Sequence, residues 1–263
     1  MVKDNLSALY EKLPSAVKLV AVSKFHPVER LMEAYDAGQR VFGENRPQEL
    51  AQKVPQMPSD VEWHFIGHLQ TNKLKFVLPY VSMVQSVDSF HLLEAIDKWG
   101  TANGKVIDIL LELHLGAEET KHGFSEEEIL ALVKEAGEGI PPETVAARPL
   151  PPQAAGPSLL CGRGWPQVSE GIPSPAGVKP DIYRGIRIRG LMGMATNTED
   201  ERVIEADFER IETLFKRIRA EYPALAENFT ELSIGMSGDW PLAVRHGATM
   251  VRIGTDIFGP REY

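Results

Sequence analysis

A regular alternation of short apolar runs with longer amphipathic stretches constrains the fold of this chain more than any other sequence feature. Eight runs have the length and composition of buried strands. They are Leu19 to Lys24, Arg40 to Asn45, Glu62 to Gly67, Met83 to Asp88, Ile107 to Leu115, Ile186 to Met194, Glu231 to Met236 and Met250 to Phe258. Strands that alternate with helical patterns indicate a parallel sheet whose strands are joined by helices.

The stretches between these strands carry helical periodicity and helix-start residues. They include Pro27 to Ala37, Pro47 to Val54, Ser89 to Trp99, Ser125 to Ala136 and Glu205 to Tyr222. Proline and serine suit the first positions of a helix, because proline loses no hydrogen bond there and serine caps free amides. Eight such units predict a single (β/α)8 TIM-like barrel, preceded by an extra helix over residues 1 to 13; an open doubly wound sheet has a similar length and stays an alternative.

Residues 137 to 185 interrupt this pattern. They contain Pro141-Pro142 and Pro149-Leu-Pro-Pro152, with scattered glycines and little periodic apolar pattern. A stretch of this composition is typical of a linker, and a structureless loop of this length is uncommon in a compact domain. We therefore expect one domain over residues 1 to 263 with a disordered insertion at 137 to 185.

The charge balance limits the partners of the chain. Its 263 residues carry a formal net charge of -9, which argues against general binding to nucleic acid or to anionic membranes and favours a small-molecule partner. Cys161 is the only cysteine, so an internal disulfide is impossible. The N-terminus lacks the apolar stretch of a signal peptide and no run has membrane-spanning length, so we expect a cytoplasmic protein.

Lys24 stands at the end of the first apolar run, Leu19-Val-Ala-Val-Ser-Lys24. Active sites of (β/α)8 barrels lie at the C-terminal ends of the strands. A lysine drawn into that opening would lose hydration, which lowers its pKa and makes the nucleophilic amine available for Schiff-base chemistry. From this feature alone, a lysine that extends to solvent is an equally good interpretation.

The last two strands end in segments suited to an anion. Barrels commonly bind phosphate with the loops after strands 7 and 8. Ser237 and Gly238 follow strand 7 before a helix that begins near Asp239, and Gly254 and Thr255 follow strand 8. Tight turns would explain either loop alone, but two such loops at both positions favour a phosphate site.

Three further polar residues fall on inward positions of the predicted strands. Arg252 alternates with Val251 and Ile253, so it should point into the barrel and need an acceptor, such as a cofactor heteroatom or the carboxylate of Glu44 or Glu112. His64 and His114 also face inward, where a satisfied core histidine is more common than a catalytic one. No histidine, cysteine or carboxylate cluster has the spacing of a metal site.

Seven segments in this order resemble the YggS/PROSC family of pyridoxal phosphate homeostasis proteins. They are Ala21-Val-Ser-Lys24; Phe42-Gly-Glu-Asn45 with Gln48-Glu49; His64-Phe-Ile-Gly-His-Leu-Gln-Thr-Asn-Lys73; Thr120-Lys-His-Gly123; Arg189-Gly-Leu-Met-Gly-Met194; Met236-Ser-Gly-Asp239; and Val251-Arg-Ile-Gly-Thr-Asp-Ile-Phe-Gly259. They span nearly the whole chain apart from the insertion, which is foreign to the family's compact form.

The resemblance implies a fold-type III barrel similar to the N-terminal domain of alanine racemase, with pyridoxal 5'-phosphate (PLP) as cofactor. Lys24 would carry PLP as an internal aldimine. Ser237, Gly254 and Thr255 would hold the phosphate, Asn45 would lie near the ring and Arg252 near the pyridine nitrogen. Lys73 and Lys121 match family motifs without an assigned contact, and Phe25-His26 replaces a second basic residue that some members carry after the lysine.

The resemblance also implies the function. Members of the family are regarded as PLP carriers or regulators of vitamin B6 pools, which predicts a monomeric, non-catalytic protein with PLP, and PLP-dependent apoenzymes, as partners. A PLP-dependent amino-acid racemase is the alternative, but such enzymes take a second acid/base from an additional domain, and this chain ends just after strand 8. A third reading is a barrel that binds another phosphorylated metabolite without using Lys24.

Overall fold

The computed structural model describes residues 1–116, 122–138 and 183–260, and in these parts the strands close into one parallel barrel in the order β1 to β8. The strands are β1 (Lys18–Val22), β2 (Val41–Glu44), β3 (Glu62–Phe65), β4 (Met83–Val87), β5 (Ile107–Leu113), β6 (Ile186–Gly193), β7 (Glu231–Ser233) and β8 (Met250–Ile253). Pairing of β1 with β8, through Lys18 with Met250 and Ala21 with Ile253, completes the ring. The predicted (β/α)8 fold is thereby confirmed, and the open sheet is excluded.

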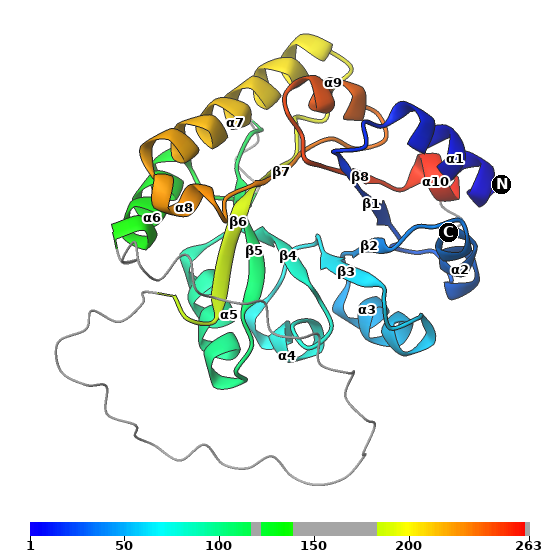
Figure 1. Ribbon diagram of the computed structural model, residues 1–263, viewed down its shortest axis with the longest axis horizontal. Helices are drawn as coiled ribbons and strands as arrows, with labels where there is room; N and C mark the ends of the chain where they lie inside the picture. Colours follow the sequence, from blue (N-terminus) through cyan, green and yellow to red (C-terminus); the bar gives the residue numbers. More distant parts are fainter. Residues whose placement is uncertain (117–121, 139–182, 261–263) are drawn as a thin grey trace, which may run out of the picture.

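Helices surround this barrel (Figure 1). They are α1 (Val2–Lys12), α2 (Val28–Asp36), α3 (Pro47–Lys53), α4 (Leu74–Val77), α5 (Phe90–Ala102), α6 (Glu126–Glu138), α7 (Glu201–Glu221), α8 (Pro223–Ala226), α9 (Trp240–Arg245) and α10 (Thr255–Phe258), with short 3-10 turns η1 (Val54–Gln56) and η2 (Thr71–Lys73). The extra N-terminal helix lies beside α10, where the Asn5 amide donates to the Ile257 carbonyl at 3.0 Å. No helix in the described parts is both long and apolar enough to cross a bilayer.

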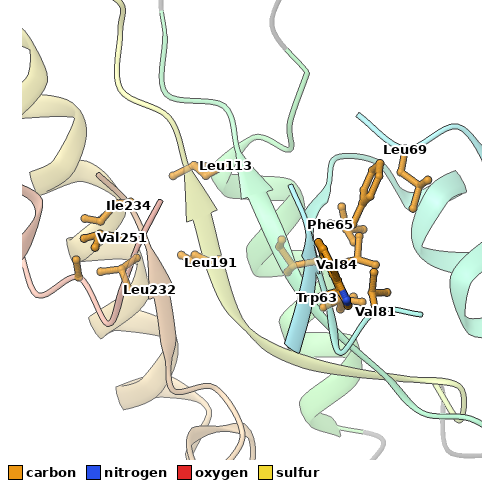
Figure 2. Packing of buried hydrophobic residues seen from close by; sticks show 14 of the residues in the cluster. Trp63, Phe65, Leu69, Val81, Val84, Leu113, Leu191, Leu232, Ile234 and Val251 are labelled. Carbon is orange, nitrogen blue, oxygen red and sulfur yellow. The ribbon is translucent and has the colours of Figure 1, made fainter. Parts of the chain in front are cut away.

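Alternation along each strand divides the core into two layers. Outward side chains pack beneath the helices, and Figure 2 shows part of this cluster, including Leu191, Leu232 and Val251 from adjacent strands. Inward side chains form a smaller cluster of Val20, Met83, Leu110, Met192 and Met250. The barrel interior is therefore filled with side chains at this level, and a ligand can enter only above it, at the C-terminal ends of the strands.

The predicted end of the last strand needs correction. The last strand was expected to run to Phe258, but β8 ends at Ile253 and Thr255–Phe258 form helix α10. The chain leaves the sheet at Gly254, whose carbonyl accepts the amides of Ile257 and Phe258 in the first turn of α10. At the edges of the segment expected as an insertion, at about 137 to 185, α6 continues to Glu138, and the Gly185 amide donates to Asp97 Oδ1 at 2.7 Å. Residues 139–182, with Cys161, lie outside the described residues.

Candidate functional site

Two adjoining cavities open at the C-terminal end of the barrel, and Lys24 lines both. The first, of about 200 Å³, is bordered by Ser237, Gly238, Gly254 and Thr255. The second, of about 380 Å³, is bordered by Asn45, Glu112, His114 and other residues from the opposite side. Together they have the volume of a small-ligand pocket. All six residues predicted to bind the cofactor, Lys24, Asn45, Ser237, Arg252, Gly254 and Thr255, line this pair of cavities.

The first cavity has the chemistry of an anion site. Thr255 begins α10 directly after Gly254, and the first amides of a helix have no partner within the helix. A Cβ on Gly238 would meet nothing within 4 Å, so the space beside it is open. Gly235 makes the close return of the β7 loop possible, because its φ is +94° and a Cβ there would lie 2.6 Å from Ala243. Amides, hydroxyls and open space therefore converge in this cavity.

A chain of hydrogen bonds across the barrel interior fixes Arg252. Its guanidinium donates to the carbonyl and the hydroxyl of Ser233, both at 2.7 Å, and to the Gly193 carbonyl at 2.9 Å. The Ser233 hydroxyl donates onward to Gln85 Oε1, and Gln85 Nε2 lies 2.7 Å from His64 Nδ1. The inward orientation of Arg252 and His64 agrees with the sequence analysis, and Arg252 lines both cavities.

Burial sets the charge of these groups. Desolvation lowers the pKa of His64 to about 3, so His64 is a neutral, hydrogen-bonded core residue. Burial also lowers the pKa of Arg252 to about 10, with Glu112 and Asp239 opposing the shift, so the guanidinium stays charged at neutral pH. Glu112, inward on β5, has its pKa raised to about 7 by burial and by Asp88.

Of the acceptors considered for Arg252, Glu44 is ruled out. Phe42 and Glu44 point out of the barrel beneath the helices, whereas Gly43 between them faces Val20 and Ile66. Glu44 Oε1 instead accepts from Lys53 Nζ and from the Ser23 hydroxyl, each at 2.6 Å. Because β2 has only four residues, its sequence pattern does not define which face of the strand Glu44 occupies.

A polar cluster supports the turn that carries Lys24; it consists of the buried Ser23, Glu44 and Lys53 and the half-buried Glu49. Lys53 Nζ donates to the Ser23 carbonyl at 2.9 Å and to Glu49 Oε2 at 3.1 Å. The same Glu49 oxygen accepts the Phe25 amide at 2.8 Å. Phe25 has a φ of 67°, an uncommon left-handed conformation for a bulky residue. Residues on both sides of Lys24 are therefore held from α3, and such local strain is typical of functional sites.

Sequence reasoning missed the role of this cluster. Glu49 and Lys53 are four residues apart on α3 and form an ion pair, which their spacing could have suggested. Their link to Lys24 could not be found in this way, because it runs through backbone atoms of Ser23 and Phe25.

Asn45 lies on the second cavity with an unused acceptor. Its Oδ1 is buried and has no hydrogen-bond partner in the described structure. The backbone of Gly67 packs directly against the backbone of Asn45, since a Cβ on Gly67 would lie 2.4 Å from the Asn45 carbonyl oxygen. A buried polar atom without a partner is uncommon, so a ligand donor is the natural complement of this site. Lys73 contacts the Phe76 ring at 5.9 Å and Lys121 lies outside the described residues.

One carboxylate and two imidazole side chains also lie close together at the rim of the second cavity. His68, Asp88 and His122 follow β3, β4 and β5, and their ligand atoms lie within 4.8 Å of one another. Their spacing in the sequence gave no indication of this cluster, because each comes from a different loop.

The barrel, with a lysine at the end of its first strand and an anion cradle after its last two, defines the class of the alanine racemase N-terminal domain. The family model of that name, "Alanine racemase, N-terminal domain", matches residues 1–146. Alanine racemase from Corynebacterium glutamicum has the same fold, with a TM-score of 0.61 at 13% identity over 100% of this chain and 61% of that chain.

Closer relatives define the family within this class. The pyridoxal phosphate homeostasis protein of Aquifex aeolicus is 32% identical, over 99% of this chain and 98% of the relative. The structure of PipY from Synechococcus elongatus PCC7942, with PLP bound, matches with a TM-score of 0.76 at 30% identity, over 98% of this chain and 100% of that chain. This chain belongs to the family of pyridoxal phosphate homeostasis proteins.

Proposed function

We propose that this protein binds PLP covalently through a Schiff base with Lys24 and takes part in vitamin B6 homeostasis, as a carrier or regulator without turnover. The observation that carries the proposal is the position of Lys24 where an anion cradle and a larger cavity meet. PLP has a phosphate on one side and an aldehyde-bearing ring, so the two cavities match its two parts. The family membership and the PLP-bound relative PipY support the same ligand.

The residues present fit this cofactor. Ser237, Gly254 and Thr255 would hold the phosphate through hydroxyls and amides. The unpartnered Asn45 Oδ1 and the guanidinium of Arg252 would face the ring from the second cavity. When bound, PLP supplies an aldehyde that a lysine amine can attack and a ring that can withdraw electrons.

Arg252 favours storage of the cofactor over catalysis. Its guanidinium donates hydrogen bonds only and stays protonated, so beside the pyridine nitrogen it would disfavour protonation of that atom. An unprotonated pyridine ring withdraws electrons weakly. Ser233 and Gly193 hold the guanidinium in a fixed orientation, which makes this effect a permanent property of the site.

The test compares purified wild type with Lys24→Ala, using Lys98→Ala on the exposed face of α5 as the matched control. With PLP, the wild type and Lys98→Ala should show a visible band at about 420 nm that borohydride removes while fixing the cofactor to the chain. Lys24→Ala should show neither the band nor the fixed label. A mutant with the same band would refute the role of Lys24, and sustained racemisation of alanine by pure protein would refute the absence of turnover.

A further inference from the structure

The rim cluster of His68, Asp88 and His122 lies where three consecutive strands of the barrel end. His68 Nδ1 is 2.8 Å from Asp88 Oδ2, and His122 Nδ1 is 3.9 Å from the same oxygen. The two imidazole rings are stacked, with centroids 4.3 Å apart. One carboxylate oxygen therefore faces two imidazole nitrogens.

The cluster has one buried side chain and two exposed ones. The Asp88 side chain is 6% exposed, whereas those of His68 and His122 are 47% and 64% exposed. The other oxygen of Asp88 accepts from the Ser89 hydroxyl at 3.1 Å, which fixes the carboxylate. The carboxylate is thus fixed at the bottom of the cluster. The two imidazole rings extend toward solvent, where they have room to rotate.

The backbone fixes the positions of both histidines. The Ser86 hydroxyl donates to the carbonyl of Gly67, next to His68. After His122, the chain returns to β5: the Phe124 amide donates to the Glu112 carbonyl at 2.8 Å, and Phe124 accepts the His114 amide at 2.9 Å. These bonds bring His122 back to the barrel rim although it is 34 residues beyond Asp88 in sequence.

We propose that His68, Asp88 and His122 form a binding site for a divalent transition-metal ion of the zinc type. Imidazole nitrogens with one carboxylate suit Zn²⁺ and Co²⁺, while Mg²⁺ and Ca²⁺ prefer oxygen ligands alone. Bonds of about 2.0 to 2.2 Å place tetrahedral ligand atoms about 3.3 Å apart. Rotation of the exposed His122 ring closes the remaining gap of its Nδ1 from Asp88 Oδ2. His68 would ligate the ion through an unprotonated Nδ1, in the tautomer that carries its hydrogen on Nε2.

Three protein ligands leave a coordination position for another group. Both histidines line the cavity that also contains Lys24, so the ion would lie in the wall of that cavity. Water or an oxygen donor of a small molecule in the cavity would take the open position. The site uses neither Lys24 nor the anion cradle, so the inference does not depend on PLP binding.

The experiment titrates Co²⁺ alone into the full-length, metal-stripped protein and follows the visible bands of four-coordinate cobalt, with Zn²⁺ as competitor. Wild type should bind one ion per chain. His122→Ala and Asp88→Asn should each weaken binding at least about tenfold. Three controls should bind like wild type: His91→Ala, an exposed histidine on α5; Cys161→Ala; and Lys24→Ala, which tests PLP binding separately.

The inference is overturned if wild type binds no cobalt with defined stoichiometry, or if His122→Ala and Asp88→Asn bind as tightly as wild type. Because His122 is largely exposed, its replacement should leave the unfolding midpoint unchanged, so lost binding cannot be ascribed to misfolding. A Lys24→Ala protein that loses the PLP band and retains cobalt would separate the two sites.

Discussion

Replacing Lys53 by methionine should destabilise the fold strongly, because it leaves the Glu44 carboxylate buried without its cation. The Glu44 side chain is fully buried, and its Oε2 already lacks a partner in the described structure. Methionine fills the space of the lysine stem but donates no hydrogen bond. Breaking a buried ion pair from one side costs about 3 to 5 kcal/mol, and we expect Lys53→Met to lose this much at pH 7.

The double variant Glu44→Gln with Lys53→Met separates the effect of the unpaired Glu44 charge from the effect of the lost hydrogen bonds. Without the carboxylate only unpaired neutral groups remain, which cost about 1 to 3 kcal/mol, so the double variant should be more stable than Lys53→Met alone. Burial already raises the pKa of Glu44, with Lys53 opposing that shift, so loss of Lys53 raises the pKa further. Glu44 then takes up a proton as the pH falls, and Lys53→Met should lose less stability at pH 5 than at pH 7.

Urea unfolding of the variants at both pH values measures these differences, with Lys98→Met as the exposed control, which should change stability by less than about 0.5 kcal/mol. Our account of the cluster fails if Lys53→Met costs under about 1 kcal/mol, or if the double variant is no more stable than the single one. Because Lys53 also holds the Ser23 carbonyl, the same variant should weaken PLP binding through the Lys24 turn.

Three further outcomes test other parts of the site. Glu112 has its pKa raised from 4.5 to about 7, so the folded state holds a proton that the unfolded state releases; wild-type stability should fall by about 3 kcal/mol as pH rises from 4.5 to 7, and Glu112→Gln should remove this slope in urea titrations. Gly67→Ala should push Asn45 away and weaken PLP binding about 5- to 150-fold in an absorbance titration, because overpacking costs about 1 to 3 kcal/mol; unchanged affinity would contradict the role of Asn45. Arg252→Met should cost about 2 to 4 kcal/mol in urea, since it leaves the carbonyls of Ser233 and Gly193 buried without this donor, and a neutral result would show that water replaces it.

The sequence predicted those parts of the molecule that depend on repetition. Strand alternation placed Arg252 inside the barrel and Val251 outside, and the rule for barrel strand ends placed Lys24 and Thr255 at one opening. Each of these predictions needs only a period and a strand count. The predicted end of β8 was wrong because Gly254 to Phe258 has only two apolar residues, and periodicity cannot distinguish a strand from a helix over so few residues.

The parts that sequence reasoning missed depend on contacts between loops. Glu44 was assigned the wrong partner because a shift of one residue in a strand reverses which face a side chain occupies. His68 and His122 are 54 positions apart, and only closure of the barrel brings them to the same carboxylate. No local sequence pattern predicts that these two histidines lie close to the same carboxylate.

Under the proposed function, the site would hold a covalent cofactor without turning over substrate, and the contrast between the two sides of the barrel opening offers a physical reason. Lys24 is fixed from α3 through Ser23 and Phe25, and Arg252 is fixed from below by Ser233. Arg252, which stays protonated, favours binding of an anionic ligand, yet it provides no proton donor of near-neutral pKa on the opposite face. Of the groups near the second cavity, Glu112 has a pKa near 7, so any residual proton transfer in this protein should depend on Glu112 and disappear in Glu112→Gln.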